Sequence, residues 1–117
     1  MKHNFKKLEI WKRSRLFVRD IYQVSKRFPR EEMYGLTSQI RRAAVSTPSN
    51  IAEGCGRNTS AQLIHFLNIS IASNCEVETQ LYVSYDLEYI NETEMKQLTQ
   101  EASEIRRMIV RFQDKLR

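Results

Sequence analysis

The chain has 117 residues, a formal net charge of +5 and a sequence pI near 9.4. A chain of this length buries roughly two thirds of the surface that its unfolded form exposes, so it needs no disulfide framework. Cys55 and Cys75 lack a CxxC pair or a neighbouring histidine, which argues against a zinc ribbon and predicts two reduced thiols. With three glycines and two prolines, the chain has room for long uninterrupted elements, which favours an all-helical domain.

The charge is unevenly distributed along the sequence. Residues 1–30 carry ten Lys and Arg against two carboxylates, a net +8, whereas residues 58–105 carry one lysine against eight carboxylates, a net −7. Residues 106–117 add a net +4. A clustered basic surface would attract phosphate backbones by releasing counterions. Alternatively, an acidic third helix lies beside the basic first helix and neutralises it within the molecule, or the charges form an ordinary solvated face.

The N-terminal segment is charged and has no apolar core of the kind found in signal peptides. No stretch approaches the ~18 consecutive apolar residues of a membrane span. We therefore expect a soluble, cytoplasmic protein without a membrane partner.

The first predicted helix ends at Pro29, because a proline disfavours the helical conformation of the preceding residue. Pro29 can also open a new turn that has Glu31 and Glu32 near its positive end. The apolar residues of this helix recur at helical spacing. They are Leu8, Trp11, Phe17, Val18, Ile21, Tyr22, Val24 and Phe28.

The second predicted helix has a narrow apolar face of small residues, which allows close packing. Pro48 offers no N–H to the carbonyl of Ala44, so this helix must kink there or restart with Thr47 as its cap. Gly54 and Gly56 then end it. The apolar face consists of Leu36, Ile40, Ala43, Ala44, Thr47 and Ile51. The expected donors to the freed carbonyls are Ser46, Ser49 and Asn50.

Two capping patterns open the remaining helices. Thr59 with Gln62 begins a helix that we expect to reach about Tyr89, and Asn91 with Glu94 begins the last one. The last helix carries an a/d stripe, namely Met95, Leu98, Ala102, Ile105, Ile109, Phe112 and Leu116. The polar residues of the third helix that need partners once buried are Ser70, Ser73 and Asn74. Residues 1–117 are thus predicted to form a single all-α domain, an antiparallel up-and-down four-helix bundle with a kinked second helix.

Recognisable catalytic and metal-binding patterns are missing from the sequence. A Glu-x-x-His metal motif fails because Gln62 stands three positions before His65, and His3 is expected in a tail. Of two adjacent arginines, Arg41 and Arg42, we expect one packed or paired and one solvated. We predict no metal, no cofactor and no enzymatic activity. A minor alternative is an enzyme that uses Asn50, Glu53 and Glu76 as a polar site.

The stretches "YGLTSQIRRAAVS", "PSNIAEG" and "EVETQL" together resemble the four-helix-bundle family that includes bacterial proteins encoded in 23S ribosomal RNA intervening sequences. The resemblance begins at Phe5 and covers nearly the whole chain. It implies a ring-shaped homopentamer whose biochemical role is unassigned; more distant relatives are basic pentamers that bind nucleic acid and a reverse transcriptase. The residues that match the family motif are Arg42, Ser46, Pro48, Asn50, Glu53, Gly54, Glu76 and Glu78.

Two functions compete at this point. The first is a non-enzymatic oligomeric scaffold that binds RNA or DNA backbone through its basic ends, although helical spacing allows only a subset of the basic residues to act together. The candidate phosphate-binding residues are Lys6, Lys7, Lys12, Arg13, Arg15, Arg19, Lys26 and Arg27. The second is an adaptor that holds a protein partner on its oligomer face or acidic third helix, with no nucleic-acid ligand.

Overall fold

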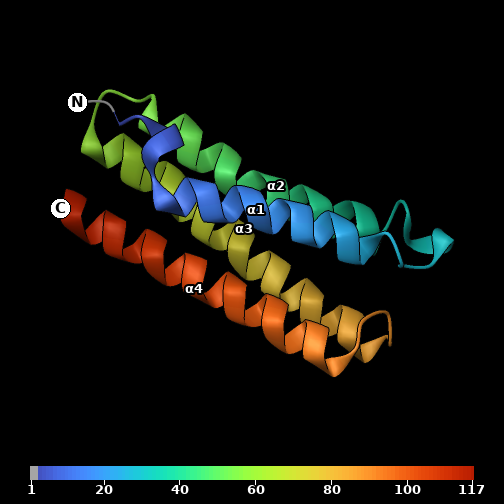
Figure 1. Ribbon diagram of the computed structural model, residues 1–117. Helices are drawn as coiled ribbons and strands as arrows, with labels where there is room; N and C mark the ends of the chain where they lie inside the picture. The colour runs from blue at the N-terminus through green and yellow to red at the C-terminus, as the bar shows by residue number, and fades with distance from the viewer. Residues whose placement is uncertain (1–2) are drawn as a thin grey trace.

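The computed structural model describes residues 3–117, so Met1 and Lys2 of the predicted domain lie outside the described residues. The elements in chain order are the 3-10 turn η1 (Phe5–Lys7), α1 (Glu9–Ser25), the 3-10 turn η2 (Arg30–Glu32), α2 (Leu36–Cys55), α3 (Ser60–Asp86) and α4 (Glu92–Leu116). Consecutive helices run in opposite directions (Figure 1), and α1 and α3 each contact both α2 and α4. The predicted all-α antiparallel four-helix bundle is confirmed.

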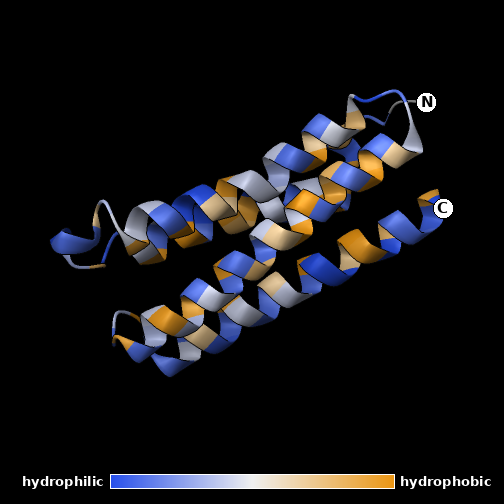
Figure 2. Ribbon diagram, turned by 180° about the vertical axis from the view of Figure 1, so that it is seen from behind, coloured by the Kyte–Doolittle hydropathy of each residue, from blue (hydrophilic) through white to orange (hydrophobic). Residues whose placement is uncertain are grey.

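The core lies between the four helices, and every helix carries both hydrophilic and hydrophobic residues along its length (Figure 2). The large apolar side chains with no solvent exposure are Ile21, Ile40, Ile51, Leu67, Val77, Leu81, Ile105 and Ile109. Burying one such side chain stabilises the fold by about 1.5–3 kcal/mol. The predicted apolar faces therefore meet in one core, to which each helix contributes. No helix in the described range combines the length and the apolar character needed to cross a membrane.

The helix ends follow the predicted caps with two differences. Asn91 and Glu94 form the expected capping box. Thr59 accepts the Gln62 N–H at 3.1 Å, but the Gln62 side chain accepts from Asn58 rather than from Thr59, so the predicted reciprocal pairing is wrong by one residue. The third helix ends at Asp86 instead of Tyr89 because Glu88 takes a left-handed φ of 66°.

The second helix runs without interruption through Pro48, so the predicted restart at Thr47 is wrong. Asn50 donates to the Ser46 carbonyl at 2.9 Å, and the Ser70 hydroxyl of α3 donates to the Thr47 carbonyl at 2.8 Å. The expected donors therefore do not reach the Ala44 carbonyl. The Ser70 bond joins α2 to α3 at the residue before the proline.

Small residues bring α2 and α3 close together. A Cβ atom on Gly54 would meet Leu63 Cδ1 at 2.8 Å and Phe66 Cβ at 2.9 Å, so a larger residue would force the helices apart. Ser73 donates to Ser46 across the same contact at 2.8 Å. Both glycines were predicted to end the second helix. Gly56 does so as its C-cap, whereas Gly54 lies inside α2 where this helix crosses α3.

Candidate nucleic-acid interface

Four of the predicted phosphate ligands share one exposed face of α1. Lys12, Arg15, Arg19 and Lys26 fall within about 60° of arc at about 100° per residue, and all four are exposed. We call this set the α1 basic face. Lys12 lies 3.6 Å from Glu9 and Arg19 lies 3.9 Å from Asp20, and such exposed pairs hold their partners weakly. The four cations are therefore accessible to an external anion.

Arg13 and Arg27 point instead toward α4, where carboxylates neutralise them. Arg13 donates to Glu101 at 2.5 Å and lies 3.3 Å from Glu104. The hydrogen bond to Glu101 raises the pKa of Arg13. Arg27 pairs with Glu94 at the other end of α1. These two arginines join α1 to α4, and their role as phosphate ligands stays an untested prediction. The carboxylates that pair with them come from α4 rather than from the expected third helix.

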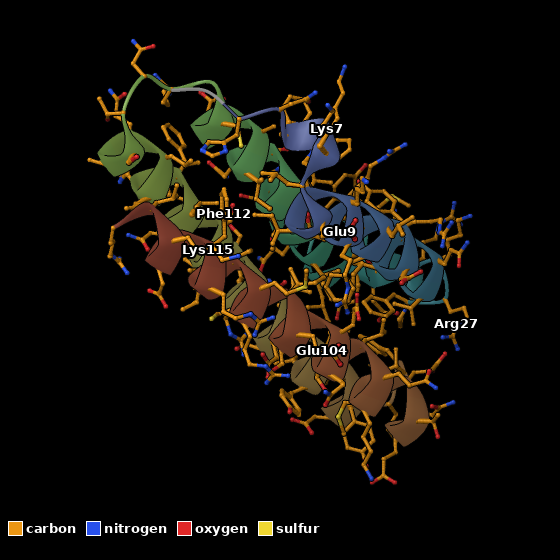
Figure 3. The ribbon with its side chains drawn as sticks, turned by 60° about the vertical axis from the view of Figure 1, so that its left-hand side comes forward. Lys7, Glu9, Arg27, Glu104, Phe112 and Lys115 are labelled. Atoms are coloured by element: carbon orange, nitrogen blue, oxygen red, sulfur yellow. The ribbon has the colours of Figure 1, made fainter. Side chains whose placement is uncertain are left out.

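Lys6 and Lys7 lie in the 3-10 turn that precedes α1, and both are exposed. Lys7 and Lys115 are found toward the same end of the bundle, far from Arg27 (Figure 3). The turn is anchored by aromatic packing, because the Phe5 ring meets the Trp11 ring at 5.1 Å. His3, which was expected in a tail, lies before this turn and outside any helix, and its ring packs edge-on against Phe112 at 5.4 Å.

The last two turns of α4 add cations that the list of candidates missed. Arg107, Arg111 and Lys115 are exposed and spaced four residues apart, so they form one stripe. Because α4 runs antiparallel to α1, this stripe ends beside the beginning of α1, where Arg111 and Lys115 line a surface pocket with Leu8. The net +4 of residues 106–117 signalled these cations, but sequence alone did not place them next to α1.

The motif residues lie on α2 and α3 and form no common polar site. Glu53 pairs with Arg57 at 2.8 Å, Glu76 accepts from Gln80 at 3.2 Å, and Glu78 pairs with Arg106 at 2.7 Å. Asn50 instead bonds to Ser46. The three side chains of the predicted minor enzymatic site therefore each have a separate partner.

Of the two adjacent arginines, one is packed and the other is solvated, as predicted. Arg41 donates to Ser25 at 2.8 Å and covers the Tyr22 ring at 4.6 Å, whereas Arg42 is exposed.

Both cysteines are free thiols: Cys75 is exposed, and burial raises the pKa of Cys55. Within residues 3–117, no three His, Cys, Asp or Glu side chains gather as metal ligands would.

Comparison with known proteins places the chain in a family. Residues 6–111 match the model of the 23S rRNA-intervening sequence protein family. A similar solved structure is a protein of unknown function from the S23 ribosomal protein family of Bacteroides thetaiotaomicron, with a TM-score of 0.82 and 23% sequence identity over 89% of this chain and 97% of that one. At that identity the likeness concerns the fold. No curated protein shows significant similarity to the chain. Because the family model spans almost the whole sequence, the chain belongs to the 23S rRNA-intervening sequence protein family.

Proposed function

We propose that the protein is a non-enzymatic helical-bundle scaffold that binds the sugar-phosphate backbone of RNA or DNA through the α1 basic face. The observation that carries the proposal is the alignment of four exposed cations on one helix face. Two carboxylates, Glu9 and Asp20, lie beside these cations and neutralise them only in part. Lys and Arg side chains that neutralise backbone phosphates release the counterions condensed there, which provides affinity without reading any base. The α4 stripe of Arg107, Arg111 and Lys115 extends the positive surface at one end.

The proposal includes assembly into a homo-oligomer, for which the family resemblance suggests a pentamer. Each copy would then present its own α1 basic face to one nucleic-acid chain. Linked sites raise the overall affinity through their effective concentration, so a modest patch on each copy suffices. Solution mass with and without RNA tests this part directly.

A second candidate function, a protein-binding adaptor without a nucleic-acid ligand, has one observation in its favour. Tyr34 is 93% exposed and Met33 is 51% exposed in the connection between α1 and α2, and Leu87 is 48% exposed after α3. A protein partner that covers these side chains would remove their apolar surface from water. They lie on loops rather than on the α1 basic face, so the two functions use different residues.

Binding of an RNA hairpin by fluorescence anisotropy at low salt tests the proposal. The test variant replaces Lys12, Arg19 and Lys26 by Gln, and the matched control replaces Arg42, Arg57 and Lys96 by Gln. Both remove three exposed positive charges. We expect the test variant to lose about tenfold or more in affinity and the control to stay within about twofold, because phosphate contacts are local. Equal losses in both variants, or no binding by the wild type at low salt, would overturn the proposal and favour the adaptor.

A further inference from the structure

An apolar groove runs between α1 and α2, directly beside the α1 basic face. It has a volume of about 380 Å³. Its apolar lining residues are Phe5, Trp11, Val18, Val45, Pro48 and Ala52. Arg15 belongs both to this lining and to the α1 basic face, so the groove and the cations share one surface.

The groove exists because small residues of α2 stand opposite a large aromatic residue of α1. Ser49 and Ala52 leave space against Trp11, and the Phe5 ring stands against Trp11 from the 3-10 turn. Val45 is 39% exposed within this lining. The groove is therefore open to solvent and is lined by two aromatic side chains and by aliphatic side chains.

Arginines already rest on the aromatic rings of this seam. The Arg15 guanidinium lies 5.2 Å from the centre of the Trp11 ring, and Arg41 lies 4.6 Å from the centre of the Tyr22 ring. Trp11 and Tyr22 lie on the same flank of α1, about 16 Å apart at 1.5 Å rise per residue. Aromatic rings alternating with basic side chains are the pattern by which proteins hold single-stranded nucleic acid.

We propose that this groove accepts an unpaired nucleobase, so that the protein prefers single-stranded over double-stranded nucleic acid. The inference rests on the proposed function and names its substrate class. The base packs against the Trp11 ring, and the Arg15 guanidinium moves from the ring to the adjoining phosphate. A duplex keeps its bases stacked inside and offers this surface only phosphates, so it contacts the α1 basic face and leaves the groove empty.

The charge around the groove favours this occupant over the larger cavity at the other end of the bundle. That cavity has a volume of about 650 Å³, but Asp86, Glu88 and Glu94 are among its lining residues. Carboxylates repel a phosphate backbone. The groove between α1 and α2, by contrast, has no carboxylate in its lining and has Arg15 at its edge.

The chain contains one tryptophan, so fluorescence of Trp11 reports directly on the groove. The probes are a single-stranded RNA, the same strand annealed to its complement, and inorganic polyphosphate, which has charge but no bases. We expect the single strand to quench Trp11 and to bind about tenfold more tightly than the duplex, since stacking on aromatic side chains adds to the phosphate contacts. The duplex and polyphosphate should bind without quenching.

Two variants separate the groove from the cations. Ser49→Leu fills the groove without changing the charge, and Thr79→Leu is the control on the exposed face of α3. We expect Ser49→Leu to abolish the quenching and to reduce single-strand affinity to the duplex level, with polyphosphate binding unchanged. Equal wild-type affinities for single strand and duplex without quenching, or wild-type behaviour of Ser49→Leu, would overturn the inference alone. Failure of all three probes to bind would remove the proposed function as well.

Discussion

Two seams of the bundle are built in opposite ways. Between α2 and α3 the helices meet at Gly54 and are joined by buried hydroxyl groups, such as Ser70 on the Thr47 carbonyl. Between α1 and α4 the links are partly exposed ion pairs, Arg13 with Glu101 and Arg27 with Glu94. Surface pockets also lie along this second seam. The first seam depends on shape, and the second depends on charge.

The difference shows how one sequence separates stability from its candidate function. The basic residues at one flank, Arg13 and Arg27, bind α4. The α1 basic face stays exposed on the outer side. The tight seam lies between α2 and α3 and contains Gly54 and the Ser70 hydroxyl. Salt should therefore weaken the α1–α4 seam and the proposed binding together, while leaving the α2–α3 seam intact.

The largest effect is expected at Gly54. Gly54→Leu should lower the free energy of unfolding by about 3 kcal/mol, because even its Cβ would lie 2.8 Å from Leu63 Cδ1. Urea denaturation followed by circular dichroism measures the change. Gly56→Ala is the matched control, since a Cβ there would stay 3.5 Å from the Glu53 carbonyl at a φ of −85°. A Gly54→Leu variant as stable as Gly56→Ala would show that α2 and α3 do not pack this closely.

A smaller effect is expected at Ser70, which has no solvent exposure. Ser70→Ala removes its hydrogen bond to the Thr47 carbonyl and should cost about 1 kcal/mol of unfolding free energy. Because this bond is buried and uncharged, the loss should be the same at low and high salt. At 1 M NaCl the Debye length is about 3 Å, so interactions between exposed charges farther apart than this are largely screened. A loss of stability that disappears at this salt concentration would contradict this account of the seam.

The ion pair of the other seam should behave in the opposite way. A double-mutant cycle with Arg13→Met and Glu101→Gln should give a coupling free energy of about 0.5–1 kcal/mol at low salt, since both side chains are roughly one-third exposed. The coupling should shrink at high salt. A coupling that does not respond to salt would show that the α1–α4 seam is also held by packing rather than by charge.

The smallest effect concerns the pH dependence of stability. The Leu36 N–H and the Tyr89 hydroxyl donate to Glu32 at 3.1 and 2.8 Å and lower the pKa of that carboxyl. Ionised Glu32 therefore contributes stability above its ordinary pKa of about 4.3, and the contribution is lost as pH falls through the lowered value. The stability difference between wild type and Glu32→Gln should shrink on acidification below about pH 4. A difference that is constant with pH would contradict this.

Helical periodicity and capping residues were sufficient to predict the four helices, because both signals are local. The Asn91 and Glu94 capping box is an example. The end of α3 was missed because Glu88 takes a left-handed conformation that its residue type does not favour. The continuity of α2 through Pro48 was missed because the prediction considered only the missing N–H and the ring of the proline, whereas α2 is also packed against α3, for example through the Ser70 hydroxyl.

The candidate interface could be predicted in part. Charge counting found the basic ends, and the 3.6-residue period could separate Arg13 and Arg27 from the other α1 cations. Which of the two sets faces α4 depends on Glu94, Glu101 and Glu104, which are more than sixty residues away in the chain. The groove beside Trp11 likewise requires α2 to be placed against α1.

The proposed binding through the α1 basic face is tested most directly by the salt dependence of RNA affinity. The logarithm of the association constant is measured against the logarithm of salt concentration for the wild type, for the Gln variant at Lys12, Arg19 and Lys26, and for the charge-matched Gln variant at Arg42, Arg57 and Lys96. Three lost phosphate contacts should reduce the slope by about 2 in the first variant, with the wild-type slope retained in the second. Identical slopes in all three proteins would contradict the account.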